Sequence, residues 1–163
     1  MSTLEFQRSL PAKRMGAGLL LRDSQGRVLM VEPTYKPNWE IPGGAVDVDE
    51  SPRQCVVREI GEELGIAVTP GRLLVIDYQH PEPGRTESIM FVFDGGVVDT
   101  AWADQIELAA DELHRWRLVA PDELSTLAIP RLCRRINHAV AAASNGQTLY
   151  LENGQRCPQS THR

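Results

Sequence analysis

The sequence predicts a single domain of the mixed α/β or α+β class. Three observations predict this fold class. Predicted strands lie on both sides of one strongly marked helix, a second helix pattern follows near the C-terminus, and the length of 163 residues fits one domain. The hydrophobic fraction is 42% and the charged fraction is 24%, so a packed core is expected. We interpret residues 1–163 as one domain, with flexible tails at 1–12 and 154–163.

The first two predicted strands form a hairpin. Residues 15–21 and 28–32 are apolar, and the polar stretch 23–26 between them, which ends in glycine, is a turn signal. Residues 39–41 are expected to be extended, because the following Pro42 disfavours helix in the residue before it.

Residues 51–64 carry the clearest helix pattern of the chain. Ser51 suits the N-cap and Pro52 the first helical position, and Gln54 completes a capping box three residues after Ser51. Gly65 suits the position just past the C-terminal end. Apolar residues recur at a spacing of four and form the stripe expected to face the core: Val56, Ile60 and Leu64, with Val57 beside them.

The remaining elements continue the mixed pattern. Residues 72–78 and 88–94 are predicted strands on either side of a loop rich in proline and glycine, and Gly95-Gly96 is expected to end the second strand. Residues 100–112 are acidic and are interpreted as a loop with a short helical turn. A short strand, a helix start, a helix and a last strand are predicted at 116–119, 121–124, 130–143 and 148–151, with disorder past residue 154.

Composition excludes several classes of partner and location. The formal net charge of −5 argues against binding a nucleic acid duplex, which requires a basic surface. It does not exclude a phosphate-bearing small molecule, because a bound divalent cation reverses the local field. Three widely spaced cysteines indicate neither a zinc site nor a disulfide framework, and a cytoplasmic location is expected. No signal peptide and no membrane span is predicted.

Three glutamates of the predicted helix are the main candidates for chemistry. Glu59, Glu62 and Glu63 lie at i, i+3 and i+4 and share one face, expected roughly opposite the apolar stripe. Like charges at this spacing destabilise a helix by about 0.2–0.5 kcal/mol per pair, and Gly61 costs about 1 kcal/mol more. A solvated acidic face is the simple alternative. A hard divalent cation such as Mg²⁺ or Mn²⁺ would offset the repulsion, which favours a functional site.

The residues around these glutamates form a longer motif. Gly44 is followed after five residues by Glu50 and after seven more by the stretch 58–66, Arg-Glu-Ile-Gly-Glu-Glu-Leu-Gly-Ile. This pattern resembles the Nudix box at every fixed position. The lead-in Trp-Glu-Ile-Pro-Gly-Gly at 39–44 is similar as well.

The resemblance implies a fold, a reaction and a set of site residues. The implied fold is an α/β/α sandwich with a mixed β-sheet. The implied activity is that of a Mg²⁺-dependent pyrophosphohydrolase, with Mn²⁺ as a substitute, acting on a small nucleotide, nucleotide-sugar, ADP-ribose or dinucleotide. The implied metal ligands are Glu59, Glu62, Glu63 and the backbone of Gly44. The implied catalytic residues are those glutamates with Arg58 and Glu112, and the implied substrate-binding residues are Gly43, Gly44 and Tyr35.

Several of these roles have structural alternatives. Arg58 resembles the arginine that orients a box glutamate, but it also suits a plain i,i+4 ion pair with Glu62. Glu50 is either part of the site or an ordinary loop acid. A further acid from a later loop is expected in this family, and Glu112 is placed first because it lies nearest a predicted strand. The other candidates are Glu107 and Asp111, and surface charge is the alternative for each. One box glutamate or this later acid would deprotonate the attacking water.

Substrate identity is less clear from the sequence. Tyr35 is the least core-like aromatic, whereas core packing is the alternative for Trp39, Tyr78, Phe93 and Trp116. Pro81 lies near the spacing at which some family members acting on ADP-ribose carry a proline. The sequence leaves two alternative functions. One is a catalytically silent nucleotide sensor. The other is the related isopentenyl diphosphate isomerase, which needs a catalytic cysteine and metal-binding histidines, but the histidines of this chain do not lie in a cluster. A homodimer is left open.

Overall fold

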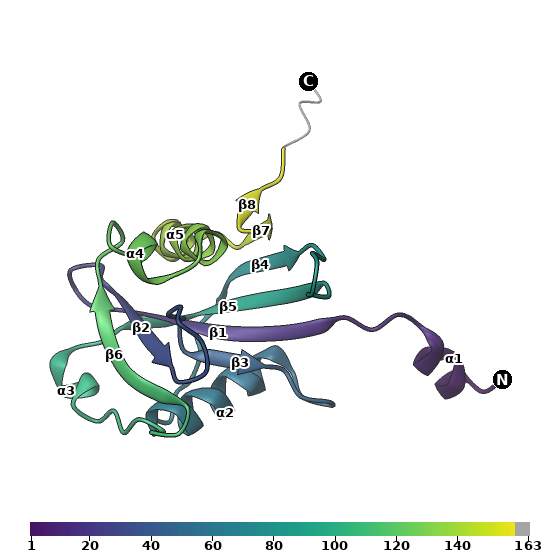
Figure 1. Ribbon diagram of the computed structural model, residues 1–163, viewed down its shortest axis with the longest axis horizontal. Helices are drawn as coiled ribbons and strands as arrows, with labels where there is room; N and C mark the ends of the chain where they lie inside the picture. Colours follow the sequence, from purple (N-terminus) through teal and green to yellow (C-terminus); the bar gives the residue numbers. More distant parts are fainter. Residues whose placement is uncertain (159–163) are drawn as a thin grey trace.

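A computed structural model describes residues 1–158, and they form one mixed β-sheet with helices on both faces (Figure 1). The strands are β1 (Arg14–Arg22), β2 (Val28–Pro33), β3 (Gly43–Ala45), β4 (Leu73–Gln79), β5 (Ser88–Val97), β6 (Leu113–Val119), β7 (Leu149–Glu152) and β8 (Gln155–Arg156). The helices are α1 (Thr3–Ser9), α2 (Pro52–Leu64), α3 (Thr100–Ala103), α4 (Leu124–Leu127) and α5 (Pro130–Asn145).

The sheet consists of one continuous row of strands and one short strand, β3, beside that row. Its order is β6-β2-β1-β5-β4-β7-β8, and β3 pairs with β1 beside this path. The β1–β5 and β4–β7 pairs are parallel and the other pairs are antiparallel. The α2 helix lies against one face and α5 against the other, so the predicted α/β/α sandwich with a mixed sheet is confirmed (Figure 1).

Each face of the sheet has its own hydrophobic core, because β1 is buried on both sides. Leu20 of β1 belongs to the core under α5, together with Ile136 of that helix. Its neighbours Leu19 and Leu21 belong to the core under α2, together with Ile60. Successive side chains of a strand point to opposite faces, so a continuous apolar run is what a strand covered on both faces requires.

The α2 helix has the caps that its sequence predicts. The Ser51 hydroxyl accepts a hydrogen bond from the Gln54 backbone N–H at 3.2 Å, and the Gln54 side chain accepts one from the Ser51 N–H at 2.9 Å. Gly65 ends the helix with a left-handed φ of 68°. Val56, Ile60 and Leu64 of the predicted stripe are fully buried, which confirms the helix and this inner face. Including Val57 in the stripe is wrong, because its side chain lies toward solvent and is 42% exposed.

The β5 strand does not end at Gly95-Gly96, and this prediction is wrong. The strand continues to Val97, which pairs with Arg22 at the end of β1 after a register shift. A Cβ atom at Gly95 would lie 2.6 Å from a methyl carbon of Leu21 and 2.9 Å from the carbonyl oxygen of Leu20. Glycine is therefore present here because the two strands approach closely, not because the strand stops.

Both ends of the described chain carry secondary structure. The α1 helix has a capping box between Ser2 and Glu5, contains no buried residue and extends away from the sheet (Figure 1). Flexibility of residues 1–12 stays a prediction. Disorder past Gly154 is wrong for Gln155–Arg156, which form β8 and pair with β7. The end of the predicted C-terminal tail, 159–163, lies outside the described residues.

Two expectations from composition concern the whole described chain. The three cysteines Cys55, Cys133 and Cys157 are free thiols. Within residues 1–158, no helix has both the length and the apolar character that crossing a bilayer requires.

Candidate active site

The site is built where α2 crosses the short glycine strand β3. The register pairs Gly43 with Gly18 and Gly44 with Ala17. Gly43 has a φ of 147°, and a Cβ atom there would lie 2.1 Å from the carbonyl oxygen of Ala17. A Cβ atom at Gly44 would lie 2.2 Å from a carboxylate oxygen of Glu59. The two glycines are therefore not only the flexible corner that the sequence predicts, because they form a paired strand that allows close approach on both sides.

The box glutamates divide into two inner residues and one outer residue. Glu63 is only 8% exposed, and its Oε2 atom accepts a hydrogen bond from the Gly43 N–H at 2.9 Å. The Glu59 carboxylate lies against Gly44, whereas the side chain of Glu62 is 53% exposed. The expectation that all three lie opposite the apolar stripe is therefore wrong for Glu59 and Glu63, which face the glycine strand.

Arg58 links four carboxylate and carbonyl groups. Its Nε and Nη2 atoms donate to the two oxygens of Glu50 at 2.8 and 2.9 Å. Its Nη1 atom donates to Glu59 at 2.9 Å and to Glu62 at 3.2 Å, and Nη2 also donates to the Ala45 carbonyl at 3.0 Å. Arg58 thus makes both contacts weighed from the sequence, the one to a box glutamate and the i,i+4 ion pair. These bonds also lower the pKa of Glu50 to about 2, so Glu50 holds Arg58 in place.

The surroundings of the two inner glutamates disfavour the charged form of their carboxylates. Burial raises the pKa of Glu63 to about 8 against the hydrogen bond from Gly43, and the charges of Glu59, Glu112 and Glu40 raise it further. Burial also raises the pKa of Glu59, although Arg58 opposes this shift. A buried and a partly buried carboxylate, both with a raised pKa, lie together where one of them, Glu63, lines a cavity, and such a pair is typical of functional sites.

Glu112 is brought to this group by the loop that follows α3. The backbone N–H of Glu107 donates to the backbone carbonyl oxygen of Leu64 at 2.9 Å, and the N–H of Ala109 donates to the backbone carbonyl oxygen of Glu63 at 3.1 Å. These hydrogen bonds attach the loop to the C-terminal end of α2. Glu112 follows at once, and its charge raises the pKa of both inner glutamates. Its role as the later acid of the site stays a prediction.

The chemistry of the donor set fits a divalent cation. Among residues 1–158, no three side chains of the ligand types His, Cys, Asp and Glu converge into a ready-made metal site. Arg58 holds Glu59 and Glu62, and the backbone of Gly43 holds Glu63. The available atoms are nonetheless hard carboxylate oxygens in mutual repulsion, and a small divalent cation is the group that such oxygens bind.

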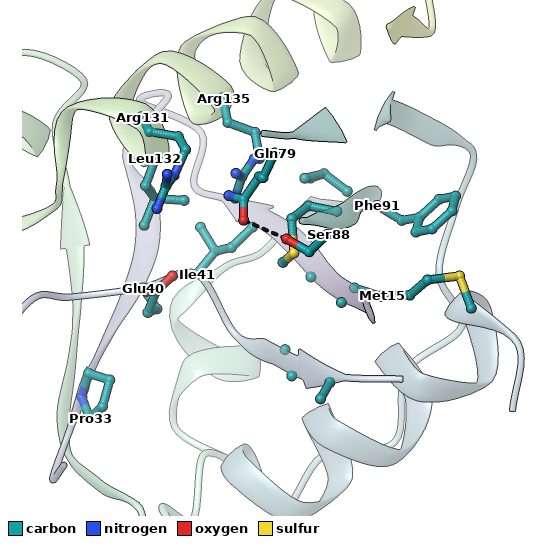
Figure 2. A pocket seen from close by; sticks show the side chains of 18 of the residues that line it. Met15, Pro33, Glu40, Ile41, Gln79, Ser88, Phe91, Arg131, Leu132 and Arg135 are labelled. Atoms are coloured by element: carbon teal, nitrogen blue, oxygen red, sulfur yellow. Dashed lines mark hydrogen bonds between the residues drawn. The ribbon is translucent and has the colours of Figure 1, made fainter. Parts of the chain in front are cut away.

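A cavity of about 220 Å³ opens beside the inner glutamates (Figure 2). Its lining includes Glu63 and all three predicted substrate residues, namely Gly43, Gly44 and Tyr35. Apolar side chains form much of its wall: Ile41, Met90, Phe91, Ile129 and Leu132. The sequence did not indicate the contributions of β5 and α5, because no local pattern shows that these distant segments meet.

The remaining sequence candidates have structural roles or lie apart from the cavity. Trp39 is 4% exposed and packs in the core. Cys55 is fully buried, and burial raises the pKa of its thiol to about 11, which argues against a reactive thiol at this position. His80 pairs with Glu152 on the surface. His162 lies outside the described residues.

Comparison with known proteins agrees with the motif and the fold. A family model described as the NUDIX domain matches residues 12–140. A putative 8-oxo-dGTP diphosphatase of Bacillus subtilis (strain 168) is 32% identical over 140 residues, which span 85% of this chain and 88% of that protein. A MutT-like protein of Streptomyces ambofaciens is 42% identical over 109 residues, or 67% of this chain and 64% of that protein.

Solved structures resemble the whole sandwich. The crystal structure of a MutT protein from Methanosarcina mazei Go1 aligns with a TM-score of 0.65 at 24% identity. The alignment covers 86% of this chain and 100% of that protein. At this identity, the likeness establishes the shared fold.

Proposed function

Because this chain belongs to the Nudix family, we propose that it is a pyrophosphohydrolase that uses Mg²⁺ or Mn²⁺ to cut a diphosphate linkage in a nucleoside diphosphate derivative. One observation carries this proposal. The carboxylates of the partly buried Glu59 and the buried Glu63 lie against the glycine strand Gly43–Gly44, at the edge of a cavity that Glu63 itself lines. Carboxylates for a cation, open backbone for phosphate oxygens and space for the rest of a nucleotide thus occur together.

The cation has defined candidate ligands in this chain. Glu59, Glu62 and Glu63, with the backbone carbonyl of Gly44, would hold it. A divalent cation bound there polarises a phosphoryl oxygen and lowers the pKa of water. Arg58 has two tasks in the proposal: it keeps Glu59 beside Gly44, and it offsets charge on Glu62.

The proton of the attacking water requires an acceptor among the protein side chains. We assign this role to Glu112, because the loop fastened to α2 brings its charge close to both inner glutamates. The backbone N–H of Gly43 orients Glu63 at 2.9 Å. Tyr35 is 76% exposed at the rim of the cavity, and we assign it a contact to the bound substrate there.

If Glu112 accepts the proton, removing its charge should slow turnover. Glu112→Gln is expected to lower kcat by about 10²–10⁴-fold with little change in KM, because the amide keeps the shape of the side chain but does not accept the proton. Steady-state kinetics at saturating metal measure this effect. Asp111→Asn in the same loop is the matched control and should keep full turnover. Full turnover and unchanged metal affinity in Glu112→Gln would remove Glu112 from the mechanism.

The substrate class is proposed from the relatives and the cavity together. Three of the similar proteins carry names that refer to 8-oxo-dGTP, CTP and RNA, which are nucleotides or built of nucleotides, and two others are named for diphosphoinositol polyphosphates. The cavity beside the glycine strand has room for a group attached to such a phosphate. We therefore propose a nucleotide substrate.

The proposed function is tested by a product assay with and without metal. Nucleoside triphosphates, dinucleotides, nucleotide-sugars and ADP-ribose are incubated with the full chain and Mg²⁺ or Mn²⁺, and the products are separated by anion-exchange chromatography. We expect cleavage of at least one class at its diphosphate, complete loss of cleavage with a chelator, and recovery when metal is restored. Nucleotide binding without cleavage of any class would instead identify a sensor and overturn the proposal.

A further inference from the structure

The inner end of the cavity, away from the box glutamates, is lined by buried polar side chains. Gln79 and Ser88 are each 3% exposed, and Arg135 is 5% exposed. With Arg131, they come from β4, β5 and α5 and meet at one place (Figure 2). Burying a polar group without a hydrogen bond costs free energy, so each of these side chains is expected to have hydrogen-bond partners.

Arg135 is fixed in position by an ion pair with a buried aspartate. Its Nε atom donates to the fully buried Asp77 at 2.7 Å, and the Gly154 N–H donates to the other Asp77 oxygen at 2.9 Å. Arg131 is paired with Glu82 at 3.2 Å. Each of these two arginines therefore has a carboxylate partner and presents its remaining N–H groups to the cavity, whose lining also includes Arg14 and Arg85.

The amide of Gln79 is oriented by these arginines. A hydrogen bond of 2.8 Å joins it to the Ser88 hydroxyl, drawn in Figure 2 with the amide oxygen toward Ser88. That orientation turns the amide nitrogen, a donor, toward two arginine donors. With the amide rotated by 180°, its nitrogen donates to Ser88 Oγ, and its oxygen accepts from Arg131 Nε at 3.2 Å and from Arg135 Nη2. We assign the rotated orientation because it pairs every donor with an acceptor.

With the Gln79 amide in this orientation, the inner end of the cavity offers hydrogen-bond donors to a ligand. The Ser88 oxygen accepts from Gln79, so the Ser88 hydroxyl hydrogen is available to donate. Arg131 has further N–H groups beyond those used by Gln79 and Glu82. In the part of the chain that the structure describes, the inner end thus presents donors between apolar walls that include Ile41 and Leu132.

We propose that this end of the cavity selects a nucleobase with a keto group, of the guanine or uracil type, over one with an amino group at the same position. This inference rests on the proposed function and names the substrate class of the same site. Arg131 and Ser88 are the specificity-determining residues. Apolar walls suit a flat ring, and the N–H groups of Arg131 together with the Ser88 hydroxyl suit the carbonyl oxygen of a base.

The chemistry of the bases supports the distinction. Guanine presents two acceptors along one edge, O6 and N7, to which an arginine donates bidentately, and uracil presents O4. Adenine and cytosine carry an amino group at the equivalent positions, which would place a donor against the donors of Arg131 and Ser88. A site built of donors rejects such a base because its own groups are left unpaired.

The test compares matched substrates in wild type and variants. We expect kcat/KM of the wild type to be at least about tenfold higher for GTP than for ATP, and for UTP than for CTP. Arg131→Met is expected to reduce the GTP-to-ATP ratio by about 10- to 100-fold. Ser88→Ala, which is a smaller change within β5, is expected to reduce it by a smaller factor. Arg134→Met is the control, because Arg134 lies on the same helix but bonds to the Asn153 carbonyl outside the cavity.

A second readout separates this inference from the proposed hydrolysis. Calorimetry measures binding of GMP and AMP to the same proteins, and circular dichroism checks that each variant is folded. Tighter GMP binding that is lost in both variants supports the inference even if no nucleotide is cleaved. Equal kcat/KM for keto and amino nucleotides in an active wild type overturns it. An Arg131→Met variant that weakens all substrates equally overturns it as well.

Discussion

Replacing Glu63 with glutamine is expected to lower kcat by at least about a hundredfold, with the fold unchanged. Glutamine has the same shape and keeps an oxygen that accepts the Gly43 N–H, so the 2.9 Å contact to the glycine strand is preserved. What disappears is the negative charge at the edge of the cavity. Since that charge is proposed to hold the cation, metal affinity should fall together with kcat.

The stability of the variant distinguishes this explanation from misfolding. Burial disfavours the charged form of Glu63 and raises its pKa to about 8, so the neutral amide should leave the free energy of unfolding of the metal-free protein unchanged or higher. Urea unfolding in the presence of a chelator measures this quantity. Glu123→Gln, an exposed position next to α4, is the matched control and should change neither activity nor stability. A Glu63→Gln variant with wild-type kcat and metal affinity would falsify the assignment of Glu63 as a ligand.

Features that depend on nearby residues could be predicted from the sequence. The α2 helix has its capping box, its proline, its terminal glycine and its apolar stripe within fifteen residues of one another, so its bounds and its buried face followed directly. The box motif is equally local, and it led to the family. The burial of Glu63 and the position of Glu59 against Gly44 could not be predicted, because they depend on where β3 lies, and β3 is positioned by pairing with β1.

Features that depend on topology could not be predicted. The donors at the inner end of the cavity come from Gln79, Ser88 and Arg131, which β4, β5 and α5 bring together through strand pairing and packing on the sheet. In the sequence, each is an ordinary polar residue. Gly95 shows the same limit, because a glycine required by close strand approach cannot be distinguished locally from one that ends a strand.

The second large effect is expected at Gly44, where alanine should lower kcat by about a hundredfold and leave stability nearly unchanged. A Cβ atom there would lie 2.2 Å from Oε1 and 2.3 Å from Cδ of Glu59. These atoms are the far end of a flexible side chain, and the Gly44 backbone is not left-handed, so the protein can relieve the contact by moving the carboxylate. A displacement of about 1 Å in a reacting group is enough for an effect of this size.

Two further glycine-to-alanine variants test whether the loss of kcat in Gly44→Ala comes from the displaced Glu59 carboxylate. In Gly43→Ala, the new Cβ would meet the Ala17 carbonyl oxygen at 2.1 Å in a backbone with φ of 147°, so stability should fall by roughly 2–3 kcal/mol or more. In Gly61→Ala, no heavy atom lies within 4 Å of the new Cβ, so kcat should stay unchanged while helix propensity raises the free energy of unfolding by about 1 kcal/mol. Kinetics and urea unfolding of the three variants therefore give three different outcomes for one chemical change. If Gly44→Ala were fully active, or if it lost stability as Gly43→Ala does, the position of the Glu59 carboxylate against the glycine strand would not be what catalysis requires.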